Sequence, residues 1–133
     1  IGWICDGDNQ PSIATAQSLG FQLWHEDATF FAFFDPVINN GVHGNGRFRQ
    51  KQYHEAIIWY EKALRLGDAP IWLLWNTACA YAHLGRQAQA FTCLNRAIEA
   101  GFADRPSLEN SEHFQALHGS PQWEKLLSRL PRP

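Results

Sequence analysis

The sequence predicts an α+β fold, in which a short N-terminal β-α-β-β segment precedes a mainly helical array. Small and large apolar residues recur at a fixed spacing of 34 residues in the C-terminal part, which indicates helical repeats. Before residue 36, short apolar runs alternate with turn signals, which indicates strands. A glycine- and asparagine-rich stretch lies between the two parts and is typical of a connector. We therefore expect a β-α-β-β unit over 1–36, a linker over 37–47 and a helical domain over 48–133.

The first 36 residues contain three apolar runs and one helix signal. Residues 1–5 and 29–34 are largely apolar on both faces, and residues 21–26 form another short run. Between the first run and the second, Asn9 or Ser12 can cap a helix that Gly20 ends. So few strands would leave sheet edges unpaired, and such edges pair readily with another chain. A homodimer through these strands is therefore expected.

Asn9, Ser12 and Ala16 stand at fixed spacing before Gly20-Phe21, between a strand and a hairpin. This pattern resembles the last third of a GNAT-family N-acetyltransferase. The resemblance implies that Asn9 and Ser12 lie near the pantetheine arm of acetyl-coenzyme A. Ala16 stands where the family often has a tyrosine that acts as a general acid. The glycine-rich loop that would bind the pyrophosphate is missing, so we expect no cofactor and no catalytic residue in this chain. Capping of a turn is the alternative role for Asn9.

The region 53–101 is written twice, at the spacing of 34 residues that helix-turn-helix arrays use. The spacing predicts helices over 48–66, 71–84 and 86–100, and a decayed third unit over 107–117 and 121–130. The recurring pairs are Ala56/Ala90, Ala63/Ala97, Gly67/Gly101, Ile57/Phe91, Tyr60/Leu94 and Leu64/Ile98.

One full unit resembles a tetratricopeptide repeat (TPR), although Thr77 and Phe102 stand where Leu and Pro are usual. An ordinary helical hairpin is the alternative. The residues that carry the resemblance are Leu74, Ala78, Tyr81, Gly85, Ala90, Leu94 and Ala97. The resemblance implies that the first helix of each repeat lines a peptide groove, here with Trp72, Trp75, Cys79, His83, Glu109 and His113.

Trp72 and Trp75 also have a second predicted role. Both are large apolar residues on a predicted groove, and one and a half repeats make a short groove. We therefore expect them to pack against the acetyltransferase-like portion of the chain rather than to grip an apolar peptide. The protein partner would then be the chain's own N-terminal portion.

Composition narrows the function classes. A net charge of −2, with a pI of about 6.3 and no basic cluster, argues against nucleic acid and anionic membrane as partners. No apolar run reaches the ~18 residues of a membrane span. Three cysteines form no disulfide framework, which favours the cytoplasm, and no His or Cys spacing indicates a metal site. The chain lacks methionine and opens in an apolar run, so we expect the C-terminal piece of a longer protein.

These observations predict a non-catalytic fragment whose helical domain is a protein-interaction or scaffold module. The first alternative is part of an acetyl-CoA-dependent N-acetyltransferase acting on an unidentified amine. The second is a plain interaction module in which the N-terminal strands are only a structural cap.

Overall fold

The computed structural model describes residues 2–6, 21–26 and 29–132. Three strands precede the helices: β1 (Gly2–Asp6), β2 (Phe21–Glu26) and β3 (Thr29–Phe34). They form an antiparallel sheet in the order β1-β3-β2, with Ile4 opposite Phe31 and Trp24 opposite the same residue. The expected helix between β1 and β2, with Asn9 and Ser12, lies outside the described residues.

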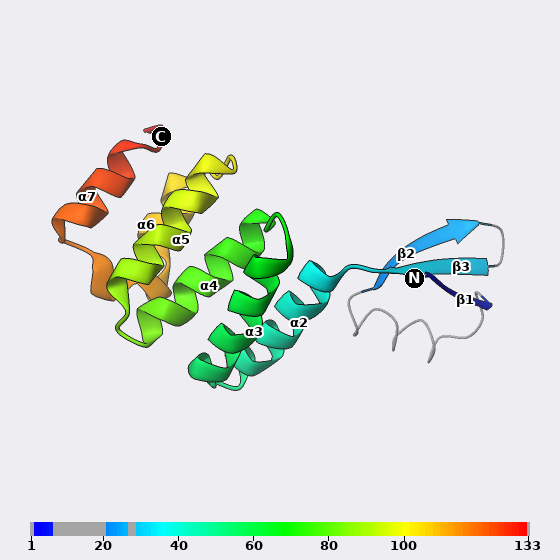
Figure 1. The fold of residues 1–133 in the computed structure, drawn as a ribbon. Coiled ribbons are helices and arrows are strands. Elements are labelled where there is room, and N and C mark those ends of the chain that lie inside the picture. Colours follow the sequence, from blue (N-terminus) through cyan, green and yellow to red (C-terminus); the bar gives the residue numbers. More distant parts are fainter. Residues whose placement is uncertain (1, 7–20, 27–28, 133) are drawn as a thin grey trace.

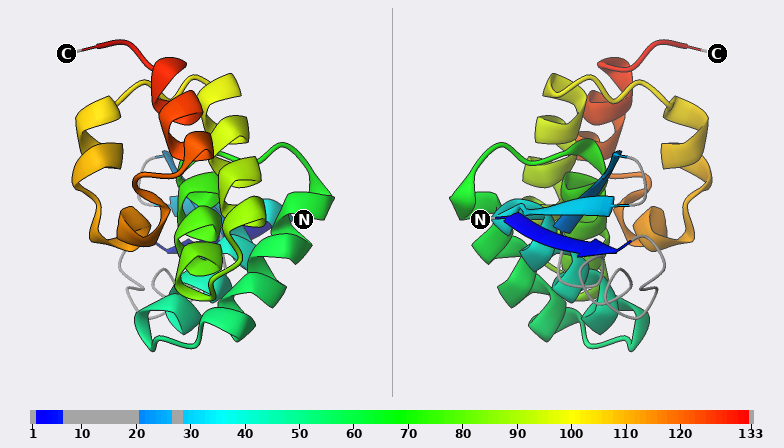
Figure 2. Two further views of the ribbon diagram at one scale, coloured as in Figure 1. Left: turned by 90° about the vertical axis from the view of Figure 1, so that its left-hand side faces the viewer. Right: turned by 90° about the vertical axis from the view of Figure 1, so that its right-hand side faces the viewer.

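Residues 35–132 form an array of helical hairpins (Figure 1). The elements are α2 (Pro36–Arg49), α3 (Tyr53–Leu66), α4 (Ile71–His83), α5 (Gln87–Glu99), α6 (Arg105–Asn110), the 3-10 helix η1 (Glu112–Leu117) and α7 (Pro121–Ser128). Helix α2 packs on α3, and α4 packs on α3, α5 and η1. Figure 2 shows α6 and η1 beside the α4–α5 hairpin.

The predicted α+β class is wrong. The part of the chain whose side chains the structure describes, residues 35–132, consists of helices and the short turns between them, and it forms a TPR-like helical array. Its single core is built from helical residues alone, including Tyr60, Leu73, Leu94, Phe114 and Leu126. The strand patterns of the first 36 residues are confined to a small sheet, and the helices determine the fold class.

The stretch 37–47, predicted as a linker, belongs to α2. Asp35 caps this helix, because its carboxylate accepts hydrogen bonds from the backbone N–H groups of Val37 at 2.9 Å and Ile38 at 3.2 Å. Pro36 occupies the first turn, where its missing N–H costs nothing. The predicted helix 48–66 is therefore two helices, of which α3 begins only at Tyr53.

Glycine is needed inside α2 because neighbouring helices approach it closely. A Cβ on Gly41 would lie 2.6 Å from the ring of Trp72 in α4, and a Cβ on Gly44 would overlap the ring of Tyr60 in α3. Gly44 stands one repeat period before Ala78, which is itself fully buried. Small residues at these positions allow the helices to pack in direct contact.

A polar network also joins the first three helices. The Tyr60 hydroxyl donates to Oδ1 of Asn45 at 2.7 Å, and Nδ2 of Asn76 donates to the same oxygen at 2.9 Å. These residues lie on α3, α2 and α4, so one asparagine oxygen connects three helices. Burial raises the pKa of Tyr60 far above its ordinary value, which keeps this hydroxyl protonated as a donor.

The remaining helices follow the predicted repeat, with local differences. Gly85 ends the α4 turn with φ of 73°, and Gly119 ends η1 with φ of 79°, as the period predicts. The predicted helix 107–117 is divided at Ser111, whose extended backbone separates α6 from η1. Helix α7 begins with Ser120 as its cap and buries Trp123.

Replacing Gly44 with alanine should lower the free energy of unfolding by about 1–3 kcal/mol, because the new methyl group would overlap the ring of Tyr60. Gly46→Ala in the same helix is the matched control, since nothing lies within 4 Å of its Cβ position. That variant should gain about 0.5–1 kcal/mol from helix propensity. Urea unfolding checks both values, and equal changes in the two variants would contradict the close contact at Gly44.

Candidate functional site

Four aromatic and imidazole rings meet where α2 ends, α3 begins, α4 ends and η1 begins. They line a depression of about 520 Å³ that we call the aromatic–histidine hollow. Its lining residues are Phe48, Arg49, Lys51, Tyr53, His83, Glu112, His113 and Gln115.

The ring contacts show how the helices build this hollow. Phe48, in the last turn of α2, lies edge-on to Tyr53 with ring centroids 5.3 Å apart, and edge-on to His113 at 5.6 Å. The rings of Tyr53 and His83 stack at 4.4 Å with an interplanar angle of 6°. Because these residues come from four elements, the hollow depends on the packing of the array.

The two histidines are joined by a direct hydrogen bond. Nε2 of His83 and Nδ1 of His113 lie 2.8 Å apart, although the residues are 30 positions apart in the sequence. One ring must donate and the other must accept, so this contact holds a single proton between the two nitrogens. The structure thus brings together two predicted groove residues, His83 and His113.

The surroundings of His83 disfavour its charged form. Partial burial lowers the pKa of His83, and nearby His113 and Lys51 lower it further, whereas Glu112 raises it. The net effect is a pKa below the ordinary value of 6.5. At neutral pH the hollow therefore presents a neutral, hydrogen-bonded pair of imidazoles.

The two predicted groove tryptophans pack inside the helical array. Trp72 lies against Gly41 of α2. Trp75 lies 5.2 Å from the ring of Phe102 and 5.0 Å from the ring of Phe114 in η1. Their described partners are helical residues of neighbouring units, so Trp72 and Trp75 hold the repeats together.

Cys79 does not reach the surface, because only 1% of it is exposed. Burial raises the pKa of its thiol to about 12, and burial raises that of Cys93 to about 11. Both are free cysteines in the core. A thiol in this state is protonated and unreactive, so Cys79 acts as a small core residue.

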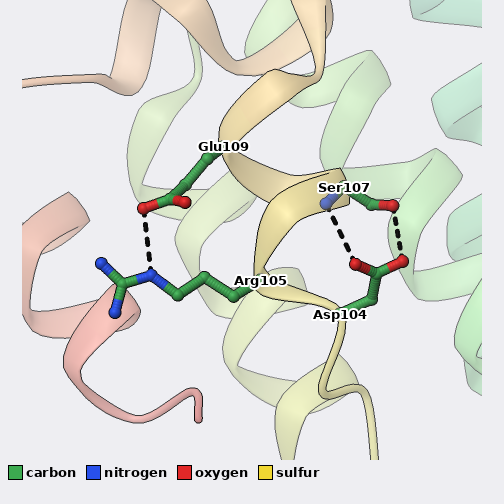
Figure 3. A network of polar contacts seen from close by, with 4 residues as sticks. All are labelled: Asp104, Arg105, Ser107 and Glu109. Atoms are coloured by element: carbon green, nitrogen blue, oxygen red, sulfur yellow. Dashed lines mark hydrogen bonds and ion pairs between the residues drawn. The ribbon is translucent and has the colours of Figure 1, made fainter. Parts of the chain in front are cut away.

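Glu109 is engaged within its own helix. Its carboxylate lies 3.0 Å from Nε of Arg105, one turn earlier in α6 (Figure 3). Beside it, Asp104 caps α6 by accepting from the backbone N–H of Ser107 at 3.1 Å, and the Ser107 hydroxyl lowers the pKa of the Asp104 carboxyl. These contacts stabilise a short helix, and Glu109 does not line the hollow.

A second depression, of about 460 Å³, lies between α5 and α7 and includes Phe91 and Arg129. The guanidinium of Arg129 donates to Asn95 and lies 3.7 Å from Glu99. The chain's own arginine therefore engages the polar groups of this groove, which leaves the aromatic–histidine hollow as the stronger candidate.

Sequence reasoning missed Phe48 and Tyr53, the two aromatic rings of the hollow. Both belong to the turn between α2 and α3, which was expected to lie within a single helix. The available signal was the repeat period: Lys51 stands 34 residues before Gly85, so a turn is due there. Asn9 and Ser12, the predicted cofactor-binding residues, lie outside the described residues.

Two further searches cover the described part of the chain. Within residues 2–6, 21–26 and 29–132, no group of three or more His, Cys, Asp or Glu side chains is arranged to hold a metal ion. Among the helices of that same part, none combines the length and apolar character needed to cross a membrane.

Comparison with protein families gives one match. Residues 47–66 and 73–100 match the tetratricopeptide repeat. These ranges cover α3 and the α4–α5 hairpin, so this part of the chain is a TPR-like helical domain. No curated protein and no solved structure matches the chain significantly. The family match does not extend to residues 1–36, and no comparison supports the acetyltransferase resemblance.

The lowered pKa of His83 predicts how stability depends on pH. The unfolded chain, with a histidine pKa of about 6.5, binds the proton more readily than the folded chain. The contribution of neutral His83 is therefore complete above about pH 6.5 and is lost as the pH falls through the lowered pKa of the folded state. Because His83 is largely exposed, we expect a loss below about 1 kcal/mol.

Urea unfolding of the wild type and of His83→Gln at several pH values measures this loss. The difference between the two stabilities should shrink as the pH falls through this window. A difference that stays constant across the window would contradict the prediction.

Proposed function

We propose that the helical array is a protein-interaction or scaffold module that binds a peptide segment of a partner in the aromatic–histidine hollow. The TPR-like array supports this proposal, because such repeats typically mediate protein–protein interactions. The observation that carries it is the meeting of Phe48, Tyr53, His83 and His113 around one depression of about 520 Å³.

The chemistry of the hollow suits a peptide better than a small polar substrate. Phe48 and Tyr53 offer aromatic surface, and His83 and His113 offer polar ring edges beside it. Arg49 and Lys51 stand on one side and Glu112 on the other, so charges of both signs surround the rings. An apolar centre with a polar rim is the usual composition of a protein-binding surface.

The narrower alternatives remain proposals. A longer parent protein could bind acetyl-coenzyme A through Asn9 and Ser12 and acetylate an amine, which the resemblance of residues 1–36 supports. The partner could also be the N-terminal portion of that parent rather than a separate protein. The described contacts of Trp72 and Trp75 favour a surface other than theirs for either partner.

Selection of random displayed peptides on the whole chain tests the proposed docking. Enriched peptides should bind Tyr53→Ala about tenfold more weakly than the wild type, because the stacked ring would be lost. Ile58→Ala is the matched control on the same helix, since Ile58 is 64% exposed and does not line the hollow.

A second variant protects this test against loss of folding. Gln115 is exposed on η1, so Gln115→Ala should fold normally and still weaken peptide binding. Enriched peptides that bind all three variants equally, or a selection that enriches no peptide, would show that the hollow is not a docking site.

We also propose that the chain self-associates through its sheet. β1 and β2 are the outer strands of the order β1-β3-β2, and outer strands present unpaired backbone groups. Light scattering at about micromolar concentration should detect a dimer of this 15.2 kDa chain, in the range where many dimers form. A particle that stays at the mass of one chain would contradict this proposal.

A further inference from the structure

We propose that the His83–His113 pair makes docking in the aromatic–histidine hollow dependent on pH. Docking takes place while the two rings share one proton, and it is lost when a second proton separates them. The proposal rests on the proposed function, because it concerns regulation of the same site.

The geometry of the pair sets this limit. With Nε2 of His83 and Nδ1 of His113 only 2.8 Å apart, a second proton would place two N–H groups head to head. Two donors cannot form a hydrogen bond, and two positive rings repel each other. The pair must therefore separate when both rings are protonated.

Each element around the pair contributes to the balance of charge. Arg49 from α2 and Lys51 from the following turn add positive charge, and both oppose the second proton. Glu112 of η1 favours it, and Tyr53 of α3 supplies a neutral ring. The structure has more positive than negative groups at the pair, and partial burial also lowers the pKa of His83.

The surroundings determine which ring moves. His83 is stacked on Tyr53 at 4.4 Å and also faces the edge of Phe48 at 6.0 Å. His113 has only edge contacts with these rings, at 5.6 Å to Phe48 and 5.0 Å to His83. Protonation should therefore turn His113 away while His83 keeps its stack.

The change stays within the hollow. Phe114 and Leu117 of η1 have no exposed surface, and together with Leu108 they anchor this part of the chain in the core. The backbone of η1 therefore keeps its place when the His113 ring moves. One wall of the hollow changes shape, and a peptide fitted to the joined rings loses its contacts.

NMR titration of the imidazole resonances in the unliganded whole chain provides the first test. His83 and His113 should titrate as a coupled pair in two steps, with the second step below the usual histidine range. In His113→Gln, the pKa of His83 should rise because one source of positive charge is gone. Independent titration of both rings near pH 6.5 would overturn the inference, whatever the chain binds.

The second test measures affinity for a selected peptide that contains no titratable side chain, at about pH 7.5 and about pH 5.5. Below the pKa of the second step, the affinity of the wild type should fall by up to about tenfold per pH unit. In His113→Gln, which cannot acquire that proton, the profile should be flat. His118→Gln is the control, because His118 lies outside the hollow and should leave the pH dependence intact.

The outcomes separate the two proposals. A peptide that binds in the hollow equally at both pH values overturns the pH dependence and leaves the docking function standing. If no peptide binds at either pH, docking itself is wrong and its regulation falls with it. A His113→Gln profile as steep as that of the wild type would also overturn the role of the pair.

Discussion

The structure depends on the close approach of neighbouring helices at positions that hold only glycine or alanine. Ala56, Ala63, Ala78, Ala90 and Ala97 have no exposed surface, and in α2 even a methyl group at Gly41 or Gly44 would meet an aromatic ring. Such contacts fix the position of each helix relative to the next, because closely packed interiors tolerate little displacement. The large rings of Tyr60 and Trp72 can lie flat against α2 only because these glycines lack side chains.

This packing also creates the candidate site. The hairpins stack so that α2 and α4 end near the starts of α3 and η1, and the rings at these four helix ends meet. None of the rings is held by its own helix alone: Tyr53 stacks on His83 of another unit, and His83 bonds to His113 of a third. The hollow is therefore a property of the array, and a single isolated hairpin would not contain it.

The sequence predicted α4, α5 and the Gly85 turn because local propensity, repeat spacing and apolar pattern agree there. It failed at α2, where Asn40 stands at the position of Leu74 and glycines stand at helix contacts, so the segment has the composition of a loop. Glycine content alone cannot distinguish a flexible connector from a close helix contact, since the difference lies in the neighbouring helix. The same error hid Phe48 and Tyr53, while His83 and His113 were found because they lie on helices with clear repeat spacing. The α+β class was wrong because strand patterns in a short segment do not report which residues build the core.

Lys51 connects the backbone of the array to the chemistry of the hollow. It stands at the repeat position of Gly85 and Gly119 and adopts the same left-handed conformation, with φ of 60°, although it is not glycine. A lysine pays about 1–2 kcal/mol for this conformation, which glycine adopts freely. In return, its ammonium group stands beside the hollow and lowers the pKa of His83. Backbone strain tends to be kept where a side chain has a task beyond stability. The first turn therefore differs from the later two in the way expected if the hollow, rather than the repeat itself, is the part of the array that acts on a partner.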